Sequence, residues 1–269
     1  MKFKIFLINM KKSPERLAFM SNQLKSLGLP FSLQEGVDGK VYDFKEVYDE
    51  ESSMRLNGAS LAPVEKGCAL SHRLAFEKAI AEDVEYTLIL EDDVELPLTF
   101  KKIFDEVLSK RDSKKTDWEY LSFNYPTVGL KFVKLWLFLL KEQFTKNPSF
   151  ILYIKIPLYI IKFLLIVVFS VYEGLRDALY KKLYAYGKPT HFYRPLYLAG
   201  CYLVTKEGVK KLLSVQKKII YPADRIQNVA RIKKGLKLFH FVPLIVKQRR
   251  DKFESTMYQN NDYVFSEYD

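Results

Sequence analysis

The amino-acid sequence predicts an α/β protein built on a doubly wound sheet, and three observations support this fold class. The chain has 269 residues, of which 48% are hydrophobic, so it can bury a sizeable core. Along residues 1–125, strand-like apolar runs alternate with segments of helical periodicity. The run at 86–90 is rich in aliphatic side chains and carries no charge, which is typical of a strand covered on both faces.

The first 28 residues predict a strand followed by a helix. Residues 3–9 are rich in Phe, Ile and Leu, as in a buried strand. Ser13 and Pro14 are residue types that begin helices and Gly28 is one that ends them, so we expect a helix up to about residue 27. The later elements are expected as follows: a strand at 31–34, a polar connection at 43–57, a helix at 63–81, a strand at 86–90, a helix at 100–108, strands at 118–123 and 201–205, helices at 206–215 and 224–233, and a strand at 236–246 broken by Pro243.

The positive charge of the chain is concentrated in one segment. Lys and Arg number 43 against 32 Asp and Glu, a formal net charge of +11 that favours anionic partners. Residues 130–188 contain ten basic and three acidic residues and so supply +7 of this charge. We therefore divide the chain into two halves of one domain, 1–129 and 189–269, separated by a basic apolar insert at 130–188.

The insert contains a 23-residue stretch, 150–172, in which only Lys155 and Lys162 are charged, so its length and hydropathy would allow a bilayer span. A single crossing is excluded if both halves form one site, because it would place them on opposite sides of the membrane. Two interpretations remain: helices lying in the membrane interface, or a buried helical arm that makes a homo-oligomer. We favour the interface, because the two lysines share a helical face and the local charge attracts anionic lipid.

Two features bear on the compartment. Cys68 and Cys201 are too few for a disulfide framework, which favours a reducing environment, although one bridge stays possible. The apolar run at the amino terminus is too short for a secretory signal and lacks a small-residue cleavage site. We therefore expect no export.

Three consecutive carboxylates, Glu91, Asp92 and Asp93, follow the strand at 86–90. In an extended backbone Glu91 and Asp93 point to one side and Asp92 to the other. One pair could therefore face a hard divalent cation while the middle acid accepts hydrogen bonds from a ribose. Ligands of open α/β sheets bind beyond the carboxyl ends of strands, which favours this interpretation over a solvated acidic turn.

Several blocks of sequence, taken in order, resemble glycosyltransferase family 25, which includes bacterial lipooligosaccharide β-1,4-galactosyltransferases and collagen galactosyltransferases. The resemblance covers residues 1 to about 125 and 190 to about 245, and leaves the insert out. The blocks are Ile8-Asn9 followed by Arg16, Val37-Asp38-Gly39, EKGCALSH at 65–72, LILEDDV at 88–94 and AGCYLVTKEGVKKLL at 199–213.

The resemblance implies an inverting transfer from a UDP-sugar on a GT-A-like, Rossmann-type fold, assisted by Mn²⁺ or Mg²⁺. By position in the motif, Asp93 is the expected direct metal ligand, with Glu91 and Asp92 holding metal-bound water or the nucleoside. His240 could supply a nitrogen ligand of the kind found at the metal in some GT-A enzymes, although an isolated histidine in a strand is more often structural.

The remaining contacts with the sugar nucleotide are expected at five residues. Asn9 and Arg16 would contact base or phosphate, against the alternatives of a turn amide and a helix-surface cation. Asp38 with Gly39 would border the uridine. Gly200 would let a sugar approach the backbone closely.

The catalytic base is expected in the second half of the chain. Asp224 matches the Pro-x-Asp block of the family and is our choice for the group that removes the acceptor hydroxyl proton. The alternative is a helix N-cap at this residue. His72 is interpreted as a hydrogen-bonded core residue with Cys68 packed beside it, and neither cysteine has an expected chemical role.

The sequence thus predicts a membrane-associated galactosyltransferase that uses UDP-galactose to extend a lipid-linked lipooligosaccharide acceptor on the cytoplasmic face of the bacterial inner membrane. UDP-GlcNAc or UDP-glucose is an alternative donor. A non-catalytic basic protein that binds an anionic membrane surface is the alternative from another class. Nucleic-acid binding is not expected, because the cations alternate with long aliphatic side chains instead of forming groove-reading motifs.

Overall fold

The computed structural model of the chain describes residues 2–124, 172, 175, 188–191, 196–249 and 252–253. The predicted insert at 130–188 lies outside the described residues except at Tyr172, Leu175 and Lys188. Among the residues described, no helix combines the length and the apolar composition needed to cross a membrane.

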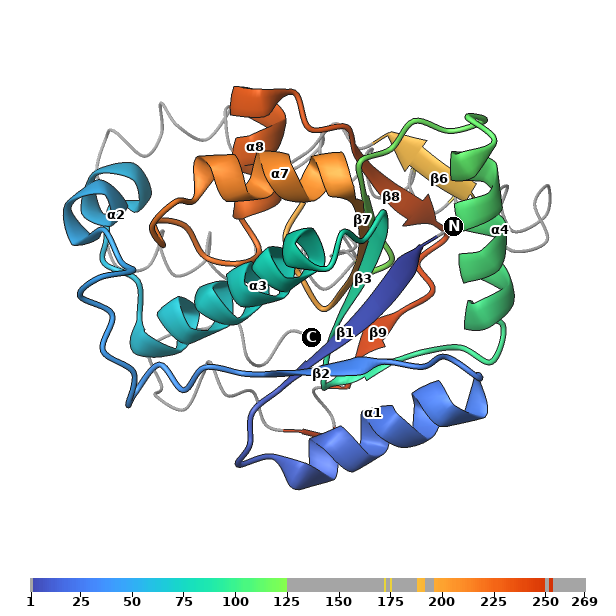
Figure 1. The fold of residues 1–269 in the computed structure, drawn as a ribbon, viewed down its shortest axis with the longest axis horizontal. Coiled ribbons are helices and arrows are strands. Elements are labelled where there is room, and N and C mark those ends of the chain that lie inside the picture. Colours follow the sequence, from blue (N-terminus) through green and yellow to red (C-terminus); the bar gives the residue numbers. More distant parts are fainter. Residues whose placement is uncertain are drawn as a thin grey trace, which may run out of the picture.

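A seven-stranded sheet forms the centre of the fold, with strand order β2-β1-β3-β7-β5-β8-β6 (Figure 1). The first three strands are parallel, β7 runs antiparallel between β3 and β5, β5 and β8 are parallel, and β6 is an antiparallel edge. The α/β class is confirmed, but alternation along the chain did not predict the two antiparallel strands. The strands are β1 Phe3–Asn9, β2 Ser32–Glu35, β3 Tyr86–Glu91, β5 Tyr120–Ser122, β6 Lys188–His191, β7 Cys201–Thr205 and β8 Leu238–Val242.

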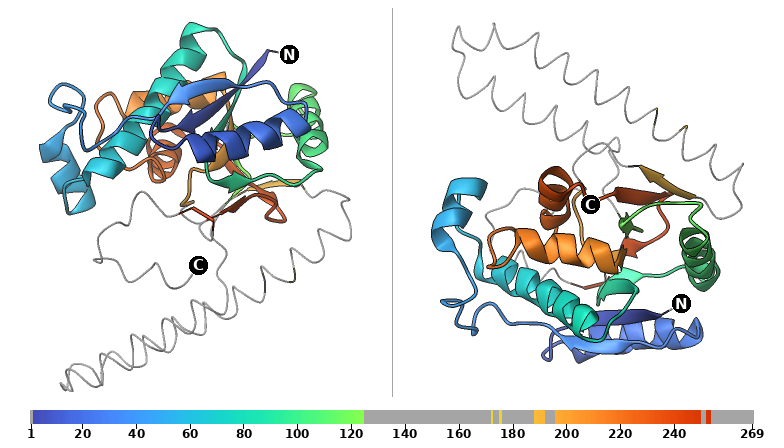
Figure 2. Two further views of the ribbon diagram at one scale, coloured as in Figure 1. Left: turned by 90° about the horizontal axis from the view of Figure 1, so that it is seen from below. Right: turned by 45° about the horizontal axis from the view of Figure 1, so that its top comes forward.

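Helices cover both faces of this sheet. One core cluster joins residues of α1 and α4 to one face, and another joins residues of α3, α7 and α8 to the opposite face. In Figures 1 and 2, α3 and α7 lie side by side on one side of the strands and α4 lies on the other. The helices are α1 Pro14–Ser26, α2 Glu50–Asn57, α3 Pro63–Ala81, α4 Phe100–Asp112, α7 Lys206–Val215 and α8 Ile226–Lys234.

Strand β3 is buried on both faces, as its composition predicts. Leu88 and Leu90 pack into the cluster with α1 and α4, while Ile89 packs into the cluster with α3 and α7. All three side chains are fully buried. This burial fixes where the strand ends, and so fixes the start of the acidic segment at Glu91.

A second, two-stranded sheet lies directly after β3. Strand β4, Val94–Glu95, pairs antiparallel with β9, Lys247–Gln248, from near the end of the described chain. The backbone N–H of Arg249 also donates to the carbonyl of Asp93 at 2.7 Å. The carboxylate segment is therefore held between β3 and β4 by residues more than 150 positions away.

Most predicted helices agree with the structure, and two differences concern polar segments. Residues 43–57 were expected to be a connection, but they contain α2, whose N-cap Asp49 accepts a hydrogen bond from the backbone of Ser52 at 2.9 Å. The apolar pattern of this helix is weak, because only Ser53 is buried in it. Helix α8 begins at Ile226 with Arg225 as its N-cap, two residues later than predicted.

Candidate functional site

A cavity of about 220 Å³ opens beyond the carboxyl ends of β1 and β3. Its walls come from segments that are far apart in sequence, including the ends of two strands, the start of α3 and the turn before α8. The residues that line it are Ile8, Asn9, Met10, Lys12, Arg16, Gly36, Val37, Asp38, Gly39, Lys40, Val64, Glu65, Cys68, Ser71, Glu91, Asp92, Asp93, Leu198, Ala199, Pro222, Ala223, Asp224 and Gln248.

One wall is a loop pressed against the start of α3. A Cβ atom on Gly39 would lie 1.6 Å from the carbonyl oxygen of Pro63, and one on Gly67 would lie 2.5 Å from that of Val37. Only glycine fits at these two contacts, because any side chain would force the backbones apart. The hydroxyl of Ser71 also accepts a hydrogen bond from the backbone N–H of Val37 at 2.8 Å. The loop is therefore built rigidly onto the helix.

Asp92 is buried and contacts Asn9 and Arg16, the two side chains predicted to bind the base or phosphate of the UDP-sugar. Asn9 Nδ2 donates to Asp92 Oδ2 at 2.7 Å, and Arg16 Nη2 lies 2.7 Å from Asp92 Oδ1. The same Arg16 nitrogen lies 2.9 Å from Asp93 Oδ2. Asn9 and Arg16 line the cavity, and both contact the acidic segment. Asn9 Nδ2 also donates to the carbonyl of Ser13 at 3.0 Å, so the alternative of a turn amide describes one of its two contacts. The alternative of Arg16 as a helix-surface cation is wrong, because the residue is 8% exposed.

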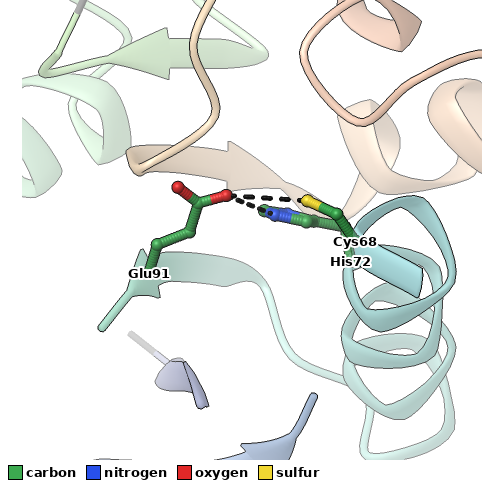
Figure 3. Close-up of side chains that lie close together, drawn as sticks. All are labelled: Cys68, His72 and Glu91. Atoms are coloured by element: carbon green, nitrogen blue, oxygen red, sulfur yellow. Dashed lines mark hydrogen bonds and ion pairs between the residues drawn. The ribbon is translucent and has the colours of Figure 1, made fainter. Parts of the chain in front are cut away.

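Glu91 points toward Cys68 and His72 of α3 (Figure 3). Its Oε1 lies 3.2 Å from Nε2 of His72 and 3.8 Å from Sγ of Cys68. Its Oε2 accepts a hydrogen bond from Nε2 of Gln248 at 3.2 Å, and the same amide nitrogen lies 3.5 Å from Asp93 Oδ1. Glu91 and Asp93 therefore converge on the amide of Gln248. The extended backbone expected for this segment is wrong, because residues 92–93 form a turn, and Asp92 shares Arg16 with Asp93 instead of facing the opposite side.

The electrostatics of this segment are dominated by buried negative charge. Burial, together with the nearby charge of Glu91, raises the pKa of Asp93 to about 6. Burial also raises the pKa of Asp92, although Arg16 opposes this shift. For Glu91, burial works in the opposite direction to the hydrogen bond from His72 and the charge of Arg16, which together lower its pKa. A site of this kind favours the arrival of a cation.

Asp224 lies in the wall of the cavity formed by the turn before α8. Burial raises its pKa, and the charges of Glu91 and Glu65 add to that shift. The alternative of Asp224 as a helix N-cap is wrong, because α8 is capped at Arg225, which makes no side-chain cap hydrogen bond. A buried carboxylate with a raised pKa in a cavity has the properties of a general base.

Asp38 and Gly39 also lie at the cavity. Lys12 Nζ lies 2.6 Å from Asp38 Oδ2, and the hydrogen bond from Lys12 lowers the pKa of that carboxyl. The backbone N–H of Lys40 donates to Asp38 Oδ1 at 3.0 Å. This rim carries lysines that an anionic ligand could approach.

The structure does not bring His240 and Gly200 to the cavity. His240 lies in β8, which β7 and β5 separate from β3, so the expected ligand set of Asp93, Glu91 and His240 is not assembled. Gly200 faces protein instead: a Cβ atom there would lie 2.8 Å from Asn124 Nδ2. Its carbonyl accepts the backbone N–H of Glu91 at 2.8 Å, and its neighbour Ala199 lines the cavity in its place.

Sequence reasoning missed three residues of this site. His72 is buried and hydrogen-bonded, as expected, but its second ring nitrogen reaches Glu91, and Cys68 reaches the same oxygen. Their spacing of four residues on one helix was a usable signal. No sequence signal marked Gln248, because its position depends on the pairing of β9 with β4.

Comparison with models of known protein families identifies the family of this chain. The model of the family described as "Glycosyltransferase family 25 (LPS biosynthesis protein)" matches residues 2–227. The chain belongs to glycosyltransferase family 25. The matched residues of this family 25 chain include the acidic segment and Asp224, whereas His240 and Gln248 lie beyond them.

Individual relatives of this family 25 chain match a shorter part of it. Procollagen galactosyltransferase 2 of Homo sapiens is 30% identical over 128 residues, which cover 44% of this chain and 20% of that protein. A glycosyltransferase 25 family member of Aedes aegypti is 30% identical over 126 residues with the same shares. A probable inactive glycosyltransferase 25 family member 3 of Rattus norvegicus is 24% identical over 128 residues, covering 44% and 22%. The chain spans about a fifth of the length of these relatives.

Proposed function

We propose that this chain is an inverting glycosyltransferase with a GT-A-like fold that transfers galactose from UDP-galactose. The observation that carries the proposal is the cavity beyond β1 and β3, in which Asp93 and Glu91 converge while Asp224 lines another wall. Family membership and the galactosyltransferases among the matched relatives support it.

A nucleotide diphosphate leaves as an anion and needs neutralisation. Glu91 and Asp93 present oxygen atoms to one shared hydrogen-bond donor, and oxygen donors of this type fit Mn²⁺ or Mg²⁺. Such an ion would act as a Lewis acid on the diphosphate. Asp93 and Glu91 would hold it, without His240. Asp38 and Gly39 would border the uridine, and Lys12 beside them would attract phosphate.

The transfer also needs a base for the acceptor. In an inverting displacement the acceptor hydroxyl oxygen bonds to the anomeric carbon, the bond from that carbon to the diphosphate breaks, and the hydroxyl proton goes to a base. Asp224 would accept this proton at its carboxylate. Its raised pKa brings its proton affinity closer to that of a base working near neutral pH.

The proposed acceptor is a lipid-linked lipooligosaccharide, reached on the cytoplasmic face of the bacterial inner membrane. The family description refers to LPS biosynthesis, and the basic apolar composition of residues 130–188 supports docking to anionic lipid. A homo-oligomer formed through this insert is the alternative use of the same composition.

Release of UDP from a panel of UDP-sugars, with and without Mn²⁺, tests the proposal. We expect release from UDP-galactose that depends on Mn²⁺, and Asp224→Asn should lower the rate by a factor of about 10²–10⁴. Asp105→Asn, at an exposed position on α4, is the matched control and should leave the rate unchanged. Faster UDP release from UDP-GlcNAc or UDP-glucose would show that this sugar nucleotide, and not UDP-galactose, is the donor. Absence of UDP release from every UDP-sugar tested would favour a non-catalytic protein. One matched relative is itself named probable inactive.

A further inference from the structure

We propose that Cys68, His72 and Glu91 form a binding site for Zn²⁺ at the wall of the cavity. The site is defined by three side chains of different chemistry on two neighbouring elements, α3 and β3. The inference concerns binding of an ion and not a reaction, and it shares Glu91 alone with the site proposed for Mn²⁺ or Mg²⁺.

The geometry of the three side chains suits a single small ion (Figure 3). One ligand atom from each residue lies within 4.8 Å of the others, with 3.2 Å from His72 Nε2 to Glu91 Oε1 and 3.8 Å from Cys68 Sγ to the same oxygen. Zinc bonds of about 2.3 Å to sulfur and about 2.0 Å to nitrogen or oxygen separate tetrahedral ligand atoms by roughly 3.3–3.6 Å. The two separations from Glu91 Oε1 are close to these values, and the ligand atoms of Cys68 and His72 lie within 4.8 Å of each other.

The donor set distinguishes this site from the one proposed for Mn²⁺ or Mg²⁺. Those hard ions prefer oxygen ligands, whereas a thiolate, an imidazole and a carboxylate together are typical of Zn²⁺. Glu91 has one oxygen directed to Cys68 and His72 and the other directed to Gln248 and Asp93. The two oxygens of one carboxylate therefore face two different sets of donors.

Neighbouring groups already orient two of the three ligands. His72 Nδ1 lies 2.8 Å from the hydroxyl of Tyr202. A metal ion would take the place of the Nε2 proton that His72 shares with Glu91, and Nδ1 would then donate to the Tyr202 oxygen. Gln248 holds the second oxygen of Glu91. Hydrogen bonds of this kind to the far side of a ligand are a regular feature of metal sites, because they fix tautomer and direction.

A fourth ligand position would open to the cavity. Cys68 and Glu91 both line it, and His72 lies behind them, 3% exposed. Three protein ligands with one open position are typical of zinc sites that bind water or another small ligand. The nearby carboxylates of Asp93 and Asp224 add negative charge that attracts a cation, and metal binding would displace the proton of the thiol.

Cobalt provides the direct test, because Co²⁺ bound by a thiolate absorbs in the near ultraviolet through charge transfer from sulfur. We expect the metal-free full-length chain to develop this band with one equivalent of Co²⁺, and Zn²⁺ to abolish it. Cys68→Ser should remove the band. Cys201→Ser, which changes the other cysteine in the buried core of β7, is the matched control and should keep it.

Two further measurements do not depend on how well Cys68→Ser folds. In the wild-type chain, Zn²⁺ should protect Cys68 from alkylation, with the modified residue identified by mass spectrometry. His72→Gln should weaken Zn²⁺ binding at least about tenfold in competition with a chelator. Absence of the charge-transfer band in the wild type, or its persistence in Cys68→Ser, would overturn the inference. Titration of UDP in the same samples tests donor binding separately, so either proposal can fail alone.

Discussion

Arg16 is the positively charged side chain that contacts both Asp92 and Asp93. Its Nη2 lies within 3 Å of a carboxylate oxygen of each residue, and the three side chains are 9%, 10% and 17% exposed. Charges this poorly hydrated require a partner, because desolvation penalises the ionised form. Arg16, which was predicted to contact the base or a phosphate of the donor, thus also neutralises two largely buried acids of the site.

Arg16→Gln should therefore destabilise the fold. Removing one partner of a buried ionic cluster costs about 3–5 kcal/mol of unfolding free energy. Urea denaturation measures the loss. Lys101→Gln is the matched control, because Lys101 pairs with Asp105 on the surface of α4, where both side chains are about half exposed, and it should cost at most about 1 kcal/mol. Equal losses in the two variants would contradict the assignment.

Asp93 should make stability depend on pH. Its pKa is raised from 3.8 to about 6, so the folded chain binds this proton more tightly than the unfolded chain. The resulting stabilisation is fully present below pH 3.8 and is lost as the pH rises through about 6. Asp93→Asn cannot titrate, so its stability relative to the wild type should increase across that window and then stay constant. A difference that does not change with pH would show that Asp93 ionises normally.

The individual residues of the acidic segment were predictable, but their partners were not. An apolar strand followed by three carboxylates indicates a ligand site at residues 91–93, because such repulsion has no use in folding alone. The partners required the tertiary structure: Arg16 approaches from α1, His72 from α3 and Gln248 from β9. His240 shows the reverse case, since its residue type fits a metal while its strand lies elsewhere in the sheet.

At the scale of elements, β9 acts on the site through its pairing with β4. The two short strands place the amide of Gln248 between Glu91 and Asp93. Gln248 is therefore a positioning residue, which holds carboxylates without itself being a predicted ligand.

Gln248→Leu should weaken Mn²⁺-dependent binding of UDP by about 10–100-fold, the range typical of groups that orient metal ligands. Binding of UDP without metal should change much less. Lys247→Ala is the matched control, because Lys247 lies next to Gln248 on β9 and is exposed. Calorimetric titration measures both variants, and an equal effect with and without Mn²⁺ would mean that Gln248 acts only on the fold.

Helices and strands with strong local signals were predicted well. Residues 63–81 and 206–215 form helices over the predicted ranges, because Pro63 starts the first and a regular apolar face supports each. The weaker cases failed for a physical reason. Helix α2 buries too little apolar surface to produce a periodic pattern, and the direction of β7 is decided by its neighbours in the sheet, not by its own sequence.

At the scale of the whole molecule, one cavity joins the two halves of the domain. Residues before 94 provide the acids and the loop at 36–40, while residues after 198 provide Asp224 and Gln248. That both halves serve one catalytic site stays a prediction, which the shared lining of the cavity supports. The role of the insert between them stays a prediction from composition.

Deleting residues 130–187, which spares β6, and joining the ends with a flexible linker should separate membrane binding from binding of the sugar nucleotide. Because the segment supplies most of the net charge, we expect the variant to lose sedimentation with anionic vesicles and to keep binding UDP-galactose. Vesicles of neutral lipid serve as the control for the full chain. Continued binding of the variant to anionic vesicles would place the membrane contact elsewhere.

Calorimetric titration of UDP-galactose in the presence of Mn²⁺ tests the central claim most directly, because it asks whether the paired carboxylates hold a sugar nucleotide through a metal. We expect the wild-type chain to bind and Asp93→Asn to bind at least about tenfold more weakly, with the difference disappearing when Mn²⁺ is removed. Asp105→Asn should behave as the wild type. Equal affinity of the wild type and Asp93→Asn with Mn²⁺ present would contradict the account.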